Sequence, residues 1–321
     1  MQKRSLLIAG GAGFVGSHLV KHMVEKYPMY DIHVIDSLTQ NGNKKRLKEC
    51  EKNITFHKID IRDKKFIDRL FLLYDFEGVI NLATETPMDR SIEEPNVFLE
   101  TNVLGTYNLT QAAIKHNCRF LQGSTDEVYG TLLHDDGRAF YEFTPFAPQS
   151  PYAASKASAD FLINSLVNTE GLNACIIHCS NNYGDNQNEE KLIPKVIKCI
   201  KTNKQIPIYG NGENVRNWIH VLDHVKALDL VYHNGKMGER YNVGGDTEIS
   251  NLELIKKICK LYDEIKGLDL NTSSRLISFV EDRKSHDLKY SINFDKIYTK
   301  LRWKPEINIT LGMMETIKHY L

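Results

Sequence analysis

The sequence lacks an excess of either charge, because its 41 lysines and arginines balance its 41 aspartates and glutamates over 321 residues. This balance argues against a protein that coats nucleic acid, although it permits a local basic pocket for one phosphate ligand. No segment approaches the roughly 18 apolar residues that a membrane span needs. The start, Met1 to Ile8, is basic and then apolar, but the apolar run is too short for a signal peptide. We therefore expect a cytoplasmic protein that contacts neither nucleic acid nor membrane.

The sequence also lacks the usual marks of a metal or disulfide site. Its six cysteines include no Cys-x-x-Cys pair, and its cysteines and histidines show no metal-ligand spacing. Cys175 and Cys179 fall in an apolar run that is typical of a buried strand. Buried structural thiols in a reducing compartment are the expected state, and no metal is expected.

Short apolar runs alternate with longer helical patterns in the first half of the chain. Stretches such as Val15–Lys26 and Phe98–His116 have helical periodicity. Strands that alternate with helices predict βαβ units, so we expect an α/β fold with a Rossmann-like, doubly wound parallel sheet and right-handed crossovers. The expected strands are Ser5–Ala9, Ile32–Asp36, Ile54–Ile59, Gly78–Leu82, Arg119–Gly123 and Ala174–Cys179.

After about Asn181 the regular alternation of strand-like and helical segments ends. We expect a smaller C-terminal α/β lobe here, which closes over the carboxyl edge of the sheet, where ligands bind in such folds. The expected domains are 1–180 and 181–321. Whether segments after residue 217 return to the first domain is not decided by the sequence. The expected elements of this half are short runs at Ile206–Tyr209 and Tyr241–Val243 and helices near Ile193–Lys201, His220–Tyr232 and Asn251–Tyr262.

A glycine-rich turn, Gly10–Gly16 (GGAGFVG), follows the first expected strand. Such a match is weak alone, but here a strand precedes it, a helix follows it, and an acidic residue, Asp36, ends the second strand. The glycines allow a tight turn and close approach to a pyrophosphate at the positive end of the helix dipole. An ordinary glycine-rich turn is the alternative, and the context favours a dinucleotide site.

Asp36 is expected to accept hydrogen bonds from an adenosine ribose. A 2′-phosphate there would meet like charge, and the following residues, Ser37, Leu38 and Thr39, include no arginine. We therefore expect NAD rather than NADP. Asp60 ends the third strand and is placed to meet the adenine, although a solvated loop aspartate explains it nearly as well.

Tyr152 and Lys156 are four residues apart, which puts both side chains on one face of a helix. A tyrosine with a pKa of about 10 is a poor base at neutral pH. A neighbouring ammonium group and a positive nicotinamide would favour the phenolate, which could then take a hydroxyl proton as hydride leaves. The spacing is common, but its place after the fifth strand of a dinucleotide-binding sheet predicts a redox pair.

Two adjacent carboxylates, Asp126 and Glu127, follow the fifth strand in the run Ser124–Gly130 (STDEVYG). Adjacent acids usually mark a solvated loop. Their place at the carboxyl end of a strand, the turn glycine and the Tyr152–Lys156 helix downstream favour catalysis instead. An acid pair whose environments split its pKa values can supply one acid and one base. The residues alone leave both interpretations open.

At these residues the sequence resembles the nucleotide-sugar (dTDP-glucose and UDP-glucose) 4,6-dehydratases of the extended short-chain dehydrogenase/reductase family. The resemblance covers nearly the whole chain. Its most specific motif is Thr-Asp-Glu-x-Tyr-Gly, because related epimerases and decarboxylases typically carry a different acid pair. The similar segments are Gly10–Gly16, Asp89–Ser91, Ser124–Gly130, Ser150–Lys156, Asn181–Gly184, Glu190–Pro194, Pro207–Gly210, Tyr241–Gly245 and Asp282-Arg283.

The resemblance implies a lyase that converts UDP-glucose or dTDP-glucose to the 4-keto-6-deoxy sugar for deoxysugar (rhamnose-type) biosynthesis. Tyr152 would take the 4-hydroxyl proton while hydride passes from C4 to NAD. Glu127 would remove the C5 proton and Asp126 would protonate the departing 6-hydroxyl, after which hydride returns to C6. Thr125 would hold the 4-oxygen, and Lys156 would hold the ribose and tune Tyr152. NAD is regenerated in each cycle and should stay tightly bound.

The resemblance also implies which residues bind the two ligands, with NAD in 1–180 and the nucleotide sugar in 181–321. Lys191, Arg216 and Arg283 would face the phosphates, since arginine can bind phosphate with both arms of its fork. Surface charge explains any one of these as well without the family. The implied NAD residues are Gly10, Gly13, Phe14, Val15, Gly16, Asp36, Ser37, Leu38, Thr39, Asp60, Ile61, Leu82, Ala83, Thr84, Thr101, Tyr152, Lys156 and Asn182. The implied substrate residues are Thr86, Thr125, Asn181, Lys191, Leu192, Pro207, Ile208, Tyr209, Arg216, Asn251, Arg283 and His286.

The chain departs from the family pattern in three loops. Thr84, Thr86 and Pro87 stand where the family usually has Ala, Ser and His, Asp185 replaces a proline, and Lys284-Ser285 replaces Pro-Gly. Thr86 keeps a hydroxyl, whereas Pro87 brings no donor. The stretches Asn186-Gln187, Ile193–Lys195 and Asn214–Arg216 look slightly more like the UDP-glucose enzymes of eukaryotes, which favours UDP-glucose weakly.

Two other functions remain open from the sequence. An NAD-dependent nucleotide-sugar 4-epimerase shares the glycine turn and the Tyr–Lys pair but needs no acid pair. A non-catalytic dinucleotide-sensing protein need not retain Tyr152, Lys156, Asp126 and Glu127 together. The resemblance also implies a homodimer, joined through a four-helix bundle of two helices per subunit, here Phe98–His116 and Tyr152–Val167.

Overall fold

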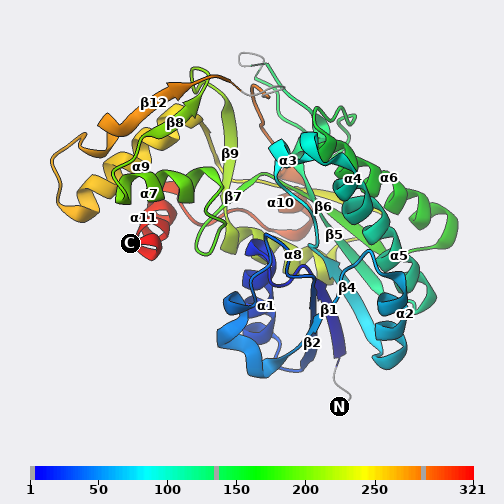
Figure 1. The fold of residues 1–321 in the computed structure, drawn as a ribbon. Coiled ribbons are helices and arrows are strands. Elements are labelled where there is room, and N and C mark those ends of the chain that lie inside the picture. The colour runs from blue at the N-terminus through cyan, green and yellow to red at the C-terminus, as the bar shows by residue number, and fades with distance from the viewer. Residues whose placement is uncertain (1–3, 134–136, 283–286) are drawn as a thin grey trace.

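The computed structural model describes residues 4–133, 137–282 and 287–321, which form two lobes (Figure 1). The larger lobe contains a sheet of seven parallel strands in the order β10-β6-β5-β4-β1-β2-β3. The order reverses between β1 and β4, and ligands bind at such a switch point outside the carboxyl ends of the strands. The strands are β1 (Arg4–Ala9), β2 (Tyr30–Asp36), β3 (Ile54–Lys58), β4 (Phe76–Asn81), β5 (Arg119–Thr125), β6 (Ala174–Cys179) and β10 (Arg240–Val243).

Helices cover both faces of this sheet (Figure 1). One face packs against α1 (Phe14–Lys26) and α8 (Val221–Asn234), which share a core with Leu6 and Ile8 of β1. The other face packs against α2 (Lys64–Leu73), α5 (Thr106–Lys115) and α6 (Pro151–Glu170). The six strands expected in the first half are confirmed, as is the doubly wound α/β fold.

The structure decides one open expectation and corrects another. A return of segments after residue 217 to the first domain was left open, and Tyr241–Val243 and His220–Tyr232 lie there: β10 pairs with β6 in the large sheet and α8 packs against that sheet. Their apolar side chains, among them Val225 and Val243, are buried in the core of the large sheet. Burial of these side chains is the physical reason that both segments belong to the larger lobe. The helix expected at Phe98–His116 is interrupted: α4 (Pro95–Phe98) leads into a π-helical segment, η2 (Leu99–Gly105), and then into α5.

The smaller lobe has its own core, which lies between two short sheets and three helices. A three-stranded sheet runs in the order β11-β9-β7, and β12 pairs with β8 in parallel. The strands are β7 (Asn181–Tyr183), β8 (Ile206–Tyr209), β9 (Val215–His220), β11 (Thr247–Ser250) and β12 (Ile277–Val280), and the helices are α7 (Leu192–Lys201), α9 (Asn251–Lys266) and α11 (Ile309–Tyr320). The remaining short elements are η1 (Lys44–Asn53), α3 (Met88–Glu93), η3 (Asp126–Tyr129), η4 (Ser273–Leu276) and α10 (Asp295–Leu301).

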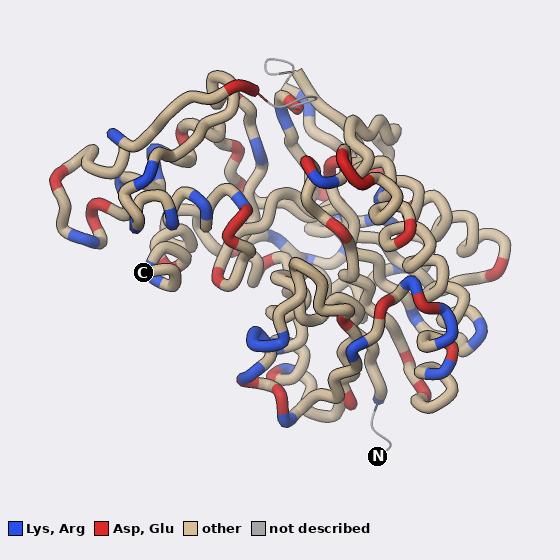
Figure 2. Tube along the Cα trace, in the orientation of Figure 1, with Lys and Arg blue, Asp and Glu red and all other residues tan. Residues whose placement is uncertain are grey.

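Acidic and basic residues are interspersed along both lobes (Figure 2). In the described ranges, no helix has the length and apolarity needed to cross a bilayer. Within the same ranges, no group of three or more His, Cys, Asp or Glu side chains could hold a metal ion.

A buried carboxylate, Asp229, joins α8 to α1. It accepts hydrogen bonds from Tyr27 at 2.8 Å and Lys26 at 2.7 Å, and its oxygens lie 2.7 Å from His22 and 2.8 Å from His233. Burial alone would raise the pKa of Asp229, but these hydrogen bonds hold it far below its ordinary value. The ionised carboxylate therefore stabilises the contact between the two helices.

Replacing Asp229 by Asn should lower the free energy of unfolding by about 2–4 kcal/mol at pH 7, because a buried charge network loses its centre. The folded-state pKa lies below the unfolded value of about 4, so the ionised group stabilises the fold above that pH. The difference between the two proteins should therefore shrink as the pH falls below about 4. Urea unfolding of both proteins at several pH values measures this difference in the free energy of unfolding. Asp68→Asn, which loses only an exposed pair with Lys64, should cost under about 0.5 kcal/mol, and an equal loss in both variants would contradict the assignment.

Candidate active site

The glycine-rich turn lies tightly between β1 and α1. Gly10 has a φ of +75°, and a Cβ there would lie 2.6 Å from the Ala83 backbone nitrogen. A Cβ on Gly16 would lie 2.1 Å from the Gly10 carbonyl oxygen. No side chain caps the start of α1, where Gly13 is the N-cap residue. The turn thus brings backbone N–H groups to a surface without side chains, as the pyrophosphate of a dinucleotide requires.

Asp36, at the end of β2, holds this turn in place. Its carboxylate accepts hydrogen bonds from the Ala12 N–H at 3.0 Å and the Leu38 N–H at 2.8 Å. Burial raises the pKa of Asp36, while these two bonds oppose the rise. Leu38 has a φ of +56°, in the left-handed region, and Ser37 and Thr39 flank it. Each oxygen keeps a further lone pair that a ribose hydroxyl can use.

The residues after β3 and β4 lie along the same edge of the sheet. Burial would raise the pKa of Asp60, but hydrogen bonds from Arg62, the shortest 2.7 Å long, hold it below its ordinary value. Asp60 is therefore paired already, and Ile61 beside it is buried. Leu82, Ala83 and Thr84 follow β4, and Thr101 lies on η2.

Asn102 is a site residue that sequence reasoning missed. Its side-chain oxygen accepts hydrogen bonds from Thr84 Oγ1 at 3.0 Å and from the Glu85 N–H at 2.9 Å. Its amide donates to Ser155 Oγ at 2.9 Å, between Tyr152 and Lys156. The amide thus joins the loop after β4 to α6. A single buried Asn in a helical pattern carries no sequence signal that distinguishes it from an exposed one.

Tyr152 and Lys156 lie on α6, as their spacing predicts. Ser150 caps this helix by accepting a hydrogen bond from the Ala153 N–H at 3.1 Å. Lys156 Nζ donates to the Gly123 carbonyl at 2.7 Å, which ties the helix to β5. Burial lowers the pKa of Lys156 to about 8. Burial and the charge of Glu127 raise the pKa of Tyr152, so its phenolate forms only where positive charge is close.

The acid pair begins where β5 ends. Thr125 caps η3, because its hydroxyl accepts a hydrogen bond from the Glu127 N–H at 3.3 Å. Burial, and then the charge of Glu127, raise the pKa of Asp126 to about 8. Burial raises the pKa of Glu127 to about 7, against the opposing charges of Lys191 and Arg216. Among the described residues, Asp126 Oδ2 has no hydrogen-bond partner. Asp126 is therefore buried, Glu127 is half-buried, and both carboxyl groups have raised pKa values, which a solvated loop does not explain.

A buried polar network that was not predicted from the sequence lies behind these residues. Asp160, on α6, accepts a hydrogen bond from Ser124 Oγ at 2.6 Å and lies 3.0 Å from His178 Nε2. His178 Nδ1 lies 3.0 Å from the Tyr129 hydroxyl, which donates to Asn242 Oδ1 at 2.8 Å. The network joins β5, β6, β10, η3 and α6, so it fixes Thr125–Glu127 relative to Tyr152 and Lys156.

The smaller lobe brings two cations toward the acid pair. Lys191 and Arg216 both lower the pKa of Glu127 against its burial, so their charges lie near it. The Arg216 guanidinium lies 4.4 Å from the centre of the Tyr290 ring and donates to the Asp287 carbonyl at 2.9 Å. Tyr290 and Asp287 were not anticipated from the sequence.

Most of the other expected substrate residues lie on elements of the smaller lobe. Asn182 was expected to face the cofactor; it accepts a hydrogen bond from His224 Nδ1 at 2.9 Å, and burial lowers the pKa of His224 to about 3, so this ring is neutral. Thr86 lies on the loop after β4, in the larger lobe, while Arg283 and His286 fall outside the described residues. Asn181 lies on β7, Leu192 begins α7, Pro207, Ile208 and Tyr209 lie on β8, and Asn251 begins α9.

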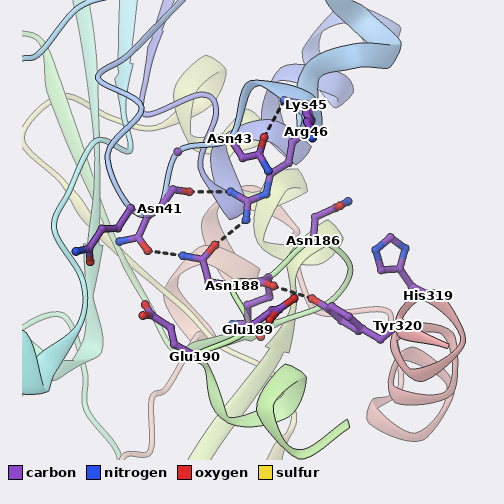
Figure 3. Close-up of a pocket in the computed structure, with 13 residues that line it drawn as sticks. Asn41, Asn43, Lys45, Arg46, Asn186, Asn188, Glu189, Glu190, His319 and Tyr320 are labelled. Atoms are coloured by element: carbon purple, nitrogen blue, oxygen red, sulfur yellow. Dashed lines mark hydrogen bonds between the residues drawn. The ribbon is translucent and has the colours of Figure 1, made fainter. Parts of the chain in front are cut away.

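A polar pocket of about 580 Å³ opens beside the glycine turn, between residues 40–46, residues 186–190 and the end of α11 (Figure 3). Arg46 donates to Asn188 Oδ1 at 2.6 Å, to the Asn41 carbonyl at 2.7 Å and to the Ala12 carbonyl at 3.2 Å. Asn188 also donates to Asn41 Oδ1, and Tyr320 donates to the Gln187 carbonyl at 2.8 Å. Arg46 thus joins a segment of the smaller lobe directly to the glycine turn.

Comparison with known proteins identifies close relatives over almost the whole chain. A dTDP-glucose 4,6-dehydratase of Haemophilus influenzae is 40% identical over 332 residues, which cover 99% of this chain and 98% of that protein. The dTDP-glucose 4,6-dehydratase of Salmonella typhimurium is 42% identical and covers 98% of this chain and 92% of its own length.

Solved structures agree with these relatives. A dTDP-glucose 4,6-dehydratase of Bacillus anthracis in complex with NAD has a TM-score of 0.89 and 38% identity, covering 99% of this chain and 96% of its own. The Streptomyces venezuelae dTDP-glucose 4,6-dehydratase with NAD and dTDP bound has a TM-score of 0.91 and 38% identity. The match covers 98% of this chain and 96% of that chain. A UDP-glucose 4-epimerase of Thermotoga maritima has a TM-score of 0.88 but 27% identity, with 98% of each chain covered.

The family comparison agrees with the resemblance that the motifs predicted. The model of the family described as GDP-mannose 4,6 dehydratase matches residues 7–316. That range includes the glycine turn, the acid pair, the Tyr–Lys pair and most of the smaller lobe. The chain therefore belongs to the GDP-mannose 4,6 dehydratase family, with the extended short-chain dehydrogenase/reductase fold.

Proposed function

We propose that this chain is an NAD-dependent nucleotide-sugar 4,6-dehydratase. It converts a nucleotide-diphosphate glucose to the 4-keto-6-deoxy sugar with loss of water. The observation that carries this proposal is the acid pair beside Tyr152 and Lys156: Asp126 is buried, Glu127 is half-buried, and the pKa values of both are raised. The relatives named dTDP-glucose 4,6-dehydratase, 40–42% identical over nearly full length, support it. A 4-keto-6-deoxy product suits deoxysugar biosynthesis of the rhamnose type, and we assign the enzyme to the cytoplasm.

The residues at the carboxyl edge of the sheet fit NAD. Gly10 and Gly16 form a cradle that any Cβ would fill, and Asp36 is placed for the adenosine ribose without an arginine for a 2′-phosphate. When bound, NAD supplies the oxidation at C4 and the matching reduction at C6. We assign its binding to 1–180 with the segments after 217 that return to this sheet, and nucleotide-sugar binding to 181–321, where Lys191 and Arg216 face the phosphates.

The side chains of this chain divide the proton transfers among themselves. Tyr152 takes the proton of the 4-hydroxyl, whose oxygen Thr125 holds, and the Lys156 ammonium stabilises the phenolate. A ketone at C4 acidifies the C5 hydrogen, because the resulting carbanion is an enolate. Glu127 removes this proton, and Asp126 protonates the departing 6-hydroxyl. The raised pKa of Asp126, about 8, keeps it protonated for this role near neutral pH.

A 4-epimerase is the second candidate, because a UDP-glucose 4-epimerase shares the fold at 27% identity. An epimerase uses the oxidation at C4 but has no need of an acid and a base at C5 and C6. The product distinguishes the two reactions. A 4-keto-6-deoxy sugar absorbs near-ultraviolet light in alkali, whereas an epimer does not. A product with only the galactose configuration would disprove the dehydratase, and a dinucleotide-sensing protein would form neither product.

The proposal also specifies which nucleotide the substrate carries, dTDP or UDP. The named relatives are dTDP-glucose enzymes, which favours dTDP-glucose, whereas the stretches around Asn186, Pro194 and Val215 favour UDP-glucose weakly. We expect turnover of dTDP-glucose with the higher kcat/KM. Steady-state assays with both sugars measure the ratio, with Tyr152→Phe as an inactive control that should lose about 10²-fold or more in kcat. A higher kcat/KM for UDP-glucose would restore the preference expected from the sequence.

Glu127→Gln should stop the reaction after oxidation at C4, because Gln cannot take the C5 proton. The oxidised sugar should then accumulate together with the reduced dinucleotide, whose near-ultraviolet absorbance can be followed in a stopped-flow experiment. Glu170→Gln, an exposed change at the end of α6, should leave the time course unchanged. If the reduced dinucleotide does not accumulate in Glu127→Gln, Glu127 is not the C5 base.

We also propose that the enzyme is a homodimer joined through a four-helix bundle. The segment η2–α5 and helix α6 pack together within the subunit. Both expose apolar side chains: Leu104 on η2 is 56% exposed and Phe161 on α6 is 57% exposed. Such side chains on adjacent helices suit burial against a second copy.

Phe161→Glu and Leu104→Glu should convert the dimer to a monomer, because each would bury a charge in the apolar interface. Sedimentation velocity measures the oligomeric state. Leu72→Glu, on α2, changes a residue that is 70% exposed outside this surface and should leave the dimer intact. A dimer that persists in both interface variants would place the contact elsewhere.

A further inference from the structure

The proposed reaction leaves one proton misplaced after every cycle. Tyr152 gains the proton of the 4-hydroxyl, and Glu127 takes a proton from C5 and later gives one back. Asp126 loses a proton to the departing 6-hydroxyl, which leaves as water. The two electrons that leave C4 return at C6, so no oxidant or reductant is consumed. The site therefore ends with one proton too many on Tyr152 and one too few on Asp126.

The structure has a hydroxyl between these two groups. Thr125 Oγ1 donates to Asp126 Oδ1 at 3.4 Å, and the Thr125 hydroxyl lies near enough to the Tyr152 phenol to lower its pKa against the effect of burial. All three side chains are buried, with exposed fractions of 8% or less. A hydroxyl can accept one proton as it gives up another, which a methyl group cannot.

We propose that Thr125 is a proton relay that resets the active site between turnovers. This inference rests on the proposed dehydratase function and adds a step to it. Tyr152 O–H donates its proton to Thr125 Oγ1 as the Thr125 hydroxyl proton moves to Asp126 Oδ1. Two O–H bonds break and two form, the Tyr152 phenolate and the Asp126 carboxylic acid are restored, and no electrons move.

The charges around Thr125 decide the direction of this transfer. Burial and the charge of Glu127 raise the pKa of Asp126 to about 8, so it accepts a proton more readily than an ordinary carboxylate. Burial and the charge of Glu127 raise the pKa of Tyr152 as well, so the transfer needs positive charge near the phenolate. Lys156, on the same helical face, and the nicotinamide of a bound NAD would supply that charge. The 3.4 Å bond is long, and such catalytic contacts tighten in the working complex.

Asp126 can also deliver the proton that it receives. Its Oδ1 faces Thr125, whereas Oδ2 has no hydrogen-bond partner among the described residues. A half-turn about the Cβ–Cγ bond exchanges the two oxygens.

Thr125→Val tests the relay, because valine keeps the shape and removes the hydroxyl. Rapid-quench assays with dTDP-glucose, or with UDP-glucose if that is turned over faster, separate the first turnover from later ones. The variant should form about one 4-keto-6-deoxy product per site and then continue about a hundredfold more slowly than its own first turnover. Imidazole or formate, as small proton carriers, should speed only the later phase. Thr125→Ser keeps the hydroxyl and should show no such slow phase.

Two results would overturn the relay. Equal slowing of the first and later turnovers would mean that Thr125 only holds the substrate. A slow phase that proton carriers leave unchanged would mean that product release limits it. Thr125→Ala serves as the second variant if valine disturbs folding, and Thr110→Val, a buried change on α5, should leave both phases as in the wild type. Failure of the dehydratase function itself would differ, since the wild type would then form no 4-keto-6-deoxy product in any turnover.

Discussion

The candidate active site depends on the buried contact between α6 and the end of β5. Lys156 Nζ donates to the Gly123 carbonyl at 2.7 Å, and Ser124 donates to Asp160 at 2.6 Å, one helical turn further on. These contacts hold α6 against β5, whose last residue is Thr125. Because the lysine and the aspartate are both buried, neither could keep its position without such partners. The relative placement of the redox pair and the acid pair follows from them.

Much of the fold was predictable from local patterns. Short apolar runs between helical stretches indicated six of the seven strands of the large sheet, and the glycine turn with Asp36 indicated the dinucleotide edge. Tyr152 and Lys156 lie on one helix, as their spacing required. The placement of β10 was not predictable, because a four-residue apolar strand fits either sheet and only long-range packing decides between them. The π-helical interruption at 99–105 has no periodic signal either.

The missed residues share a physical reason. Asn102, Asp160 and His178 are polar and buried, and each is defined by partners far away in the sequence. Sequence patterns report the period of apolar side chains, so a buried polar residue in a strand or helix looks like an exposed one. The acid pair could be proposed from its motif, but its raised pKa values come from burial, which only the fold supplies.

Arg46 has a consequence for how the protein keeps its cofactor. The Arg46 guanidinium donates to the Asn188 side chain of the smaller lobe (Figure 3) and also to the Ala12 carbonyl of the glycine turn. Parting the lobes at this point therefore also loosens the turn that cradles the pyrophosphate. Under the proposed function, release of the dinucleotide would therefore require the Arg46 contacts between the two lobes to break.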